Sequence, residues 1–115
     1  MTDETKPAEA KTATGMNQNL AGLLCYLAGW ITGLVFFLVE KENRFVRFHA
    51  MQSIITFGGL TVLFILLGFI PVLGWMIMPI LGLAQLVLWI LLMVKAYSGE
   101  YFTLPVIGDL AEKNI

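Results

Sequence analysis

The sequence predicts an all-α integral membrane protein with three transmembrane helices, and three observations support this fold class. Hydrophobic residues make up 58% of the 115-residue chain, against roughly 45–50% in soluble domains. Acidic and basic residues are absent from residues 12–39 and again from residues 48–94. A break containing glycine and proline divides the second of these stretches. A bilayer imposes such segregation, because an ionised side chain at its centre costs at least about 2.5–3.5 kcal/mol.

The three predicted spans follow from the lengths of these stretches. The first covers residues 20–39, and at about 1.5 Å of rise per residue it crosses the roughly 30 Å hydrocarbon core. The second stretch is too long for one crossing. Pro71, which lies between Gly68 and Gly74, marks a turn within it. Two further spans are therefore predicted, at about 49–70 and 75–96. No internal repeat is evident.

The remaining segments predict the domain organisation and the orientation. Residues 1–18 are typical of a disordered polar tail, and residues 19–115 form the membrane domain with an interfacial C-terminal segment. The tail resembles neither a signal peptide nor a transit peptide, because it is acidic and has no arginine. The positive-inside rule places the more basic side of the membrane in the cytoplasm. We therefore expect a multi-pass protein of the cell (inner) membrane, with the N-terminus outside and the C-terminus cytoplasmic. The basic residues behind this orientation are Lys41, Arg44, Arg47, Lys95 and Lys113 on one side and Lys6 and Lys11 on the other.

Side chains suited to catalysis or metal binding are scarce. Cys25 and His49 are the lone thiol and the lone imidazole, and three spans would separate them by most of the membrane. That separation forbids a Cys–His nucleophilic pair, and the two residues make no metal site. The spans contain no carboxylate to relay protons, and the net charge of −1 indicates no nucleic-acid partner. We predict a protein that is not an enzyme, with no cofactor and with no catalytic, cofactor-binding or metal residues.

The segment 40–53 is the most informative part of the chain. Its basic residues can reach lipid headgroups, while a polar row that includes His49 and Gln52 follows one side of the next helix. The simpler interpretation is an interfacial helix start with snorkelling arginines and internally bonded polar groups. The functional alternative is a polar entry in which Arg47 holds an anionic lipid or peptide group. The candidate functional surface consists of Arg44, Arg47, His49 and Gln52, and the expected partners are the bilayer and its anionic headgroups.

Small and polar residues inside the spans predict how the helices pack. Gly22, Gly29 and Gly33 recur at helical spacing and form a small-residue face on the first span. We favour packing of this face within the chain over packing against a second subunit. Gln85 lies deep in the third span, and we expect it to join the helices by hydrogen bonding, with Thr56 and Thr61 as candidate partners.

Two segments carry most of a family resemblance, and the closing segment 99–108 adds to it. Leu27-Ala-Gly-Trp-Ile-Thr-Gly33 and Glu40-Lys-Glu-Asn-Arg-Phe-Val-Arg-Phe-His-Ala-Met-Gln-Ser53 resemble the small prokaryotic membrane proteins of the Tic-twenty-like family. This family, related to a chloroplast inner-envelope protein-import component, includes many prokaryotic members known as a domain of unknown function. The match covers roughly residues 18–112. The plastid component is thought to have four spans, whereas three are predicted here. The resemblance implies a scaffold or translocation-type subunit.

The functional prediction is therefore a non-catalytic membrane protein that acts as a scaffold or translocation-type subunit with a protein partner. The alternative is a small channel or transporter for an ion or amphiphile. Three helices are too few to enclose a wide aqueous path, so conduction would require a homo-oligomer. Gly29 and Gly33 are the candidate contacts between its subunits.

Overall fold

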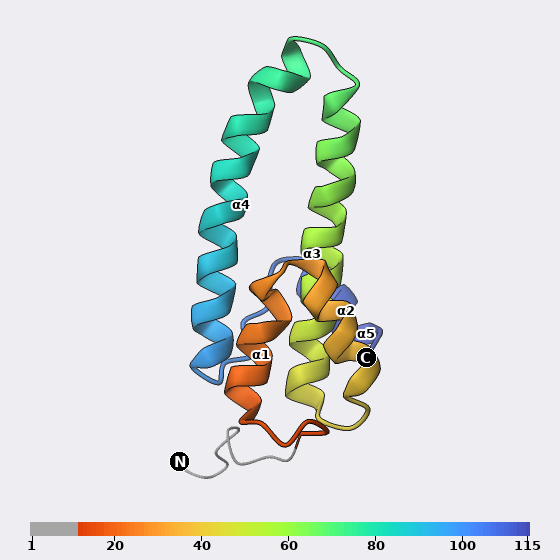
Figure 1. The fold of residues 1–115 in the computed structure, drawn as a ribbon, viewed down its shortest axis with the longest axis vertical. Coiled ribbons are helices and arrows are strands. Elements are labelled where there is room, and N and C mark those ends of the chain that lie inside the picture. Colours follow the sequence, from red (N-terminus) through yellow and green to blue (C-terminus); the bar gives the residue numbers. More distant parts are fainter. Residues whose placement is uncertain (1–11) are drawn as a thin grey trace.

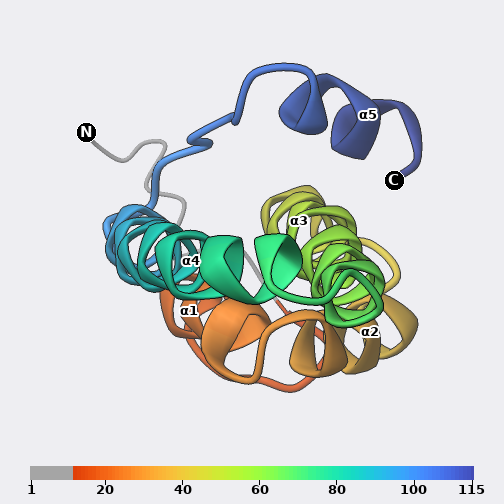
Figure 2. The ribbon, with the colours of Figure 1, turned by 90° about the horizontal axis from the view of Figure 1, so that it is seen from above.

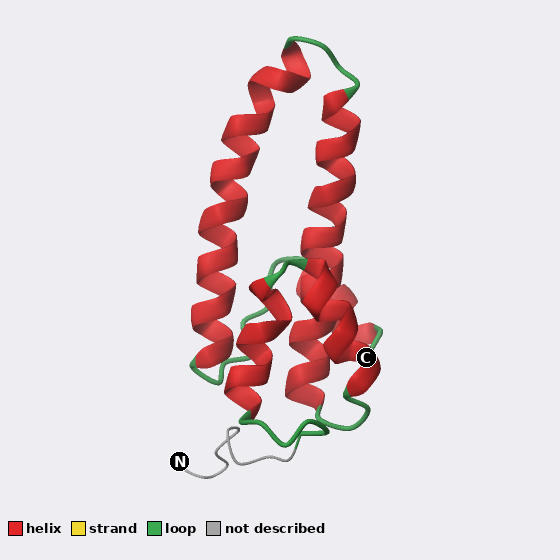
Figure 3. Cartoon of the chain, in the orientation of Figure 1, coloured by secondary structure: helices red, strands yellow, loops and turns green. Residues whose placement is uncertain are grey.

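The computed structural model describes residues 12–115, which fold into five helices and no strand (Figures 1 and 3). The all-α prediction is confirmed for this part of the chain. Two helices of 25 residues each are long and apolar enough to cross a membrane, and together they form an antiparallel hairpin. The helices are α1 (Gln18–Leu27), α2 (Trp30–Val39), α3 (Arg44–Gly68), α4 (Leu73–Tyr97) and α5 (Ile107–Lys113).

The prediction of a single span over residues 20–39 is wrong. The chain turns back at Ala28 and Gly29, so that α1 and α2 form a hairpin of two ten-residue helices. Gly29 has a φ of +65°, which glycine adopts at little steric cost. Each helix rises only about 15 Å, half the thickness of the hydrocarbon core. The other two predicted spans, 49–70 and 75–96, correspond to α3 and α4.

The α1–α2 hairpin packs on one side of the layer formed by α3 and α4, and α5 lies on the other side (Figure 2). Two glycines permit the close approach. A Cβ at Gly22 would lie 2.8 Å from the Phe45 ring, and a Cβ at Gly33 would lie 2.9 Å from the Ala50 carbonyl oxygen. Gly22 and Gly33 therefore pack against helices of the same chain. Gly29 does not belong to a helix face, because it forms the bend.

Both ends of the described chain lie at the same end of α3. The backbone N–H of Ala13 donates to Glu40 Oε1 at 2.6 Å. At the other terminus, Arg47 donates through Nε and Nη2 to the carbonyl oxygen of Ile115, at 3.3 and 3.2 Å. The three-span prediction, which puts the two ends at opposite ends of the spans, is wrong for these residues, because the α1–α2 hairpin turns back and brings both ends to the start of α3. Lys6, Lys11 and most of the predicted tail lie outside the described residues.

Helices α4 and α5 begin with the same five-residue pattern, Ile70-Pro-Val-Leu-Gly74 and Leu104-Pro-Val-Ile-Gly108. In both, the valine has a φ of +66°, a conformation that is strained for a β-branched residue. The next N–H donates to the proline carbonyl, at 2.8 and 2.6 Å. A Cβ on the closing glycine would collide with the Leu67 carbonyl in the first pattern and with Thr103 in the second. The expectation of no internal repeat missed this helix-start motif.

Candidate functional site

A buried polar network lies where α1, α3 and the segment after α4 meet. Tyr26, His49 and Gln52 are all fully buried. Tyr26 Oη lies 2.7 Å from His49 Nδ1 and accepts a hydrogen bond from Gln52 Nε2 at 3.0 Å. His49 Nε2 lies 2.8 Å from the carbonyl oxygen of Glu100. Because a carbonyl only accepts, Nε2 carries the ring proton, and Nδ1 of the neutral imidazole accepts the tyrosine O–H.

Gln52 ties the irregular segment between α4 and α5 to α3. Its Nε2 also donates to the Phe102 carbonyl at 2.9 Å, and its Oε1 accepts from the Leu104 N–H at 3.0 Å. Both polar atoms of this amide therefore have partners inside the protein. His49 and Gln52 hold backbone in place and do not line an open polar entry. Tyr26, the third member of the network, was missed because a lone tyrosine in an apolar run gives no signal in the sequence.

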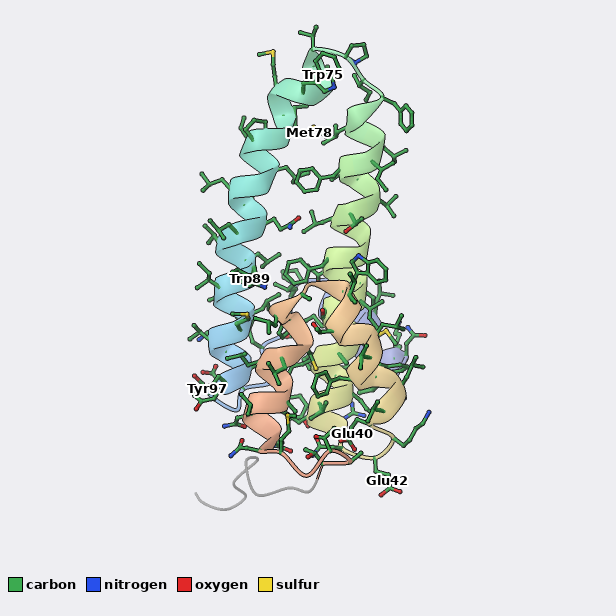
Figure 4. All side chains as sticks on the ribbon, in the orientation of Figure 1. Glu40, Glu42, Trp75, Met78, Trp89 and Tyr97 are labelled. Atoms are coloured by element: carbon green, nitrogen blue, oxygen red, sulfur yellow. The ribbon has the colours of Figure 1, made fainter. Side chains whose placement is uncertain are left out.

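The bend between α1 and α2 is held by side chains of the two long helices. Ser53 Oγ donates to the carbonyl oxygen of Gly29 at 2.8 Å, and Trp89 Nε1 donates to that of Tyr26 at 2.7 Å. Figure 4 shows Trp89 on α4 at the level of the bend. Carbonyls at a helix end lack intrahelical partners, and here distant side chains supply them.

Cys25 lies in the same half of the molecule as His49, so the predicted separation of these residues by most of the membrane is wrong. Cys25 Sγ lies 3.7 Å from the Val46 carbonyl oxygen, one turn before His49 on α3. The apolar run containing Cys25 turns back, which places its thiol beside the start of α3. The imidazole is nevertheless bonded to Tyr26 and Glu100, and the two residues make no nucleophilic pair.

Arg47 is committed to contacts within the protein. Its Nη1 donates to the carbonyl oxygens of Glu40 and Phe37, at 2.7 and 3.2 Å, at the C-terminal end of α2. Its guanidinium also lies 4.1 Å from the centre of the Phe37 ring. A cation is favourable at a helix C-terminus, where the carbonyl groups are unpaired. Arg47 therefore joins α2, α3 and the C-terminus of the chain.

Arg44 is the member of the candidate surface that remains open to the surroundings. Its side chain is 60% exposed, and its Nη2 lies 3.8 Å from Glu112 Oε2 on α5. An ion pair this exposed contributes little to stability. Burial raises the pKa of Tyr101, and the charge of Arg44 partly opposes that rise. Of the four predicted surface residues, only Arg44 is placed to meet a partner directly.

Gln85 faces an open cavity of about 410 Å³ between α3, α4 and the α1–α2 bend. Among the described residues it forms no hydrogen bond with Thr56 or Thr61. Thr61 Oγ1 donates to the carbonyl of its own helix at Phe57, and Thr56 Oγ1 is buried without a partner. The expected hydrogen bond across the helices is therefore absent. The lining residues are Leu27, Ala28, Gly29, Trp30, Phe57, Thr61, Gly82, Gln85, Leu86 and Trp89.

The described residues define a class of protein. It is a small helical membrane protein whose polar side chains form hydrogen bonds with irregular backbone. Within residues 12–115, no group of three or more His, Cys, Asp or Glu side chains could hold a metal ion. The chain belongs to the MamF/MmsF family, whose model matches residues 8–111 and is described as the magnetosome magnetite crystal formation protein family.

Curated archaeal relatives carry the name UPF0132 membrane protein. One from Methanocaldococcus jannaschii is 58% identical over 103 residues, covering 90% of this chain and 93% of the relative. One from Archaeoglobus fulgidus is 55% identical over 100 residues, covering 87% of this chain and 97% of the relative. No solved structure matches the chain significantly.

The family match corrects the resemblance to the Tic-twenty-like family. That resemblance depended on residues 27–33 and 40–53, which include the bend and the start of α3. The translocation-type role depended on the same resemblance and is withdrawn with it. What remains is a membrane protein of the MamF/MmsF family.

Proposed function

We propose that this protein is a non-catalytic scaffold that crosses the cell membrane twice and presents both described ends to the cytoplasm. One observation carries the proposal: the described basic residues lie at the end of the α3–α4 hairpin opposite its turn. Gly22 approaches both Phe45 and Ala96, so the start of α3 is level with the end of α4. The turn itself, residues 69–72, has no charge. By the positive-inside rule, the charged end is cytoplasmic.

The lengths of the charge-free sections support two crossings. Residues 48–68 of α3 and 73–94 of α4 contain no acidic or basic side chain, and each section rises about 30 Å. This matches the hydrocarbon thickness of a bilayer. Arg47 and Lys95 then mark the cytoplasmic boundary. Trp75, which is 57% exposed beside the turn, suits the aromatic belt at the opposite boundary.

The α1–α2 hairpin would then enter the cytoplasmic leaflet and return. Its bend contacts α3 at Phe57 and Gly58, which lie about 15 Å along the helix from Arg47. That depth is near the bilayer midplane. Irregular backbone is tolerated there only where protein groups satisfy it, and Ser53 and Trp89 provide such groups for the bend.

The cytoplasmic end supplies the surface on which a scaffold would act. Arg44, Glu112 and the loop residues Lys41 and Glu42 are exposed there, and Figure 4 shows Glu42 pointing away from the helices. The family description names magnetite crystal formation in magnetosomes.

Cysteine labelling tests the topology. In a Cys25→Ser background, single cysteines at Thr14, Val72 and Asn114 would be labelled with an impermeant reagent in intact cells and in inverted vesicles. We expect Thr14→Cys and Asn114→Cys to react only in inverted vesicles, and Val72→Cys only in intact cells. Labelling of Thr14→Cys and Asn114→Cys from opposite sides would restore the three-span topology.

Photo-crosslinking tests the scaffold role. A photo-reactive side chain at the exposed Arg44 should capture discrete proteins in native membranes, whereas one at the lipid-facing Leu83, which is 64% exposed, should capture lipid. Capture of lipid alone at both positions would refute a protein-binding scaffold.

The oligomeric channel or transporter is the second candidate, and the cavity beside Gln85 is the observation that favours it. An amide without a hydrogen-bond partner could face a polar solute or the headgroup of an amphiphile in an assembly of several chains. Flux of protons, sodium or potassium through proteoliposomes would support this candidate. Flux equal to that of protein-free vesicles would remove it for these ions.

A further inference from the structure

The two halves of the protein differ in cross-section. The half that contains the chain ends places α1, α2 and the segment 100–104 beside α3 and α4 (Figures 1 and 2). In the half that contains the turn, α3 and α4 are the only described elements. The α1–α2 hairpin reaches along α3 as far as Gly58, where an added Cβ would lie 3.8 Å from the Cβ of Trp30 at the start of α2. Each helix is about 10 Å across. Parts of α1, α2, α3 and α4 lie side by side in the first half, whereas only parts of α3 and α4 do so in the second.

We propose that this uneven cross-section makes the protein accumulate in membranes that are convex on the side bearing its two ends. The proposal rests on the two-span topology proposed above. In that topology the bulky half fills the cytoplasmic leaflet and the slender half fills the opposite leaflet. The protein is then a wedge, defined by residues 18–39 and 100–104 packed around one half of the α3–α4 hairpin.

The physical reason is the packing of lipid in a curved leaflet. Strong convex curvature spreads the headgroups and exposes acyl chains, and apolar groups inserted in that leaflet fill the resulting defects. The α1–α2 hairpin offers such groups over its outer surface. Its exposed apolar side chains are Leu20, Leu27, Ile31, Leu34, Val35, Leu38 and Val39.

The wedge must also keep its shape under the lateral pressure of the lipid. Three contacts hold the hairpin against α3 and its N-cap. Ser53 binds the bend, Arg47 binds the last turn of α2, and the amide of Asn43 donates to Gln18 Oε1 at 2.8 Å near the start of α1. Straightening the hairpin into a third span would carry Gln18 away from the start of α3 and break its contact with Asn43.

Membrane tethers provide the test. The full chain with Cys25→Ser and Asn114→Cys is reconstituted in giant vesicles of zwitterionic lipid, and an impermeant dye labels the copies whose C-terminus is outside. In a thin tether pulled from the vesicle, we expect these copies to be about threefold denser than in the flat membrane. Copies with the C-terminus inside, labelled by a permeant dye after external thiols are blocked, should be depleted by a similar factor. Equal density of both populations in tether and vesicle would overturn the proposal.

Two double variants make the same chemical change in opposite halves. Leu66→Trp with Ile80→Trp enlarges the slender half at side chains that are 56% and 71% exposed, and it should reduce the enrichment. Val35→Trp with Leu38→Trp enlarges the bulky half at side chains that are 52% and 57% exposed, and it should increase the enrichment. An equal change in both variants would contradict the wedge, because added tryptophan alone would then explain the sorting.

Failure of the wedge can be distinguished from failure of the topology. If Thr14→Cys and Asn114→Cys react from opposite faces, the two-span proposal falls, and the inference falls with it. If they react from the same face while the tether shows no sorting, two crossings stand and curvature preference alone is refuted.

Discussion

The two halves of the α3–α4 hairpin are both rich in apolar residues but are held together differently. In the half near the chain ends, α3 buries His49, Gln52, Ser53 and Thr56, and most of these side chains bind backbone from elsewhere in the chain. In the half near the turn, α3 and α4 expose apolar side chains on most faces. Thr61, which lies between the two halves, bonds only to its own helix.

This difference shows what irregular backbone demands inside a membrane. A regular helix satisfies its own N–H and C=O groups, and so the half near the turn needs no polar side chains. The α1–α2 bend and the segment 100–104 cannot do so, and in the proposed topology the bend lies where water is not available. The buried polar row of α3 serves these two segments. Two pairs of substitutions matched between the halves, and a third pair within the half near the turn, would break or sharpen the comparison.

The largest difference in stability is expected between substitutions of two glutamines, Gln52 on α3 and Gln85 on α4. Gln52→Leu removes the donor to Tyr26 Oη and leaves the Phe102 carbonyl and the Leu104 N–H without their partner, and should lower the free energy of unfolding by about 3 kcal/mol. Gln85→Leu removes no hydrogen bond and should change it by less than about 0.5 kcal/mol. Unfolding in mixed micelles, followed by tryptophan fluorescence, measures both. Equal costs would mean that the polar network does not distinguish the halves.

A smaller effect is expected from two helical glycines. Gly33→Leu forces a side chain against Ser53 and the Ala50 carbonyl, and should destabilise the protein by about 2 kcal/mol through overpacking. Gly59→Leu points into open space and should be neutral or mildly stabilising, because leucine favours a helix more than glycine does. The same unfolding assay applies. A tolerated Gly33→Leu would show that α2 does not pack closely on α3.

The smallest effect is expected at the turn. Val72 has a φ of +66°, so Val72→Gly relieves backbone strain and should raise the free energy of unfolding by about 1 kcal/mol. Val62→Gly, within α3, is the control and should lower it by about 0.3–0.5 kcal/mol, because glycine favours a helix less than valine does. Destabilisation by both substitutions would indicate that the side chain of Val72 contributes more than its strain costs.

Several features of the fold and the site could be predicted from the sequence. The α3–α4 hairpin follows from one long charge-free stretch and from Pro71, and the row of His49 and Gln52 was found by helical spacing. The roles of these residues were harder to predict. Their partners are Tyr26, which carries no motif, and backbone carbonyls near residues 100–104, which every sequence contains. Arg47 posed the same difficulty, because its acceptors are the carbonyls of Phe37, Glu40 and Ile115.

The sequence by itself determined that this is a helical membrane protein with long charge-free apolar stretches, because hydropathy and charge spacing are local properties of the chain. Only the tertiary structure decided that residues 20–39 turn back. That run is apolar throughout, and its length alone favours a crossing. The bend at Gly29 exists because Ser53 and Trp89, far along the chain, satisfy its carbonyls. Hydrogen bonds from distant residues thus decide whether residues 20–39 form a third span or a hairpin confined to one half of the molecule.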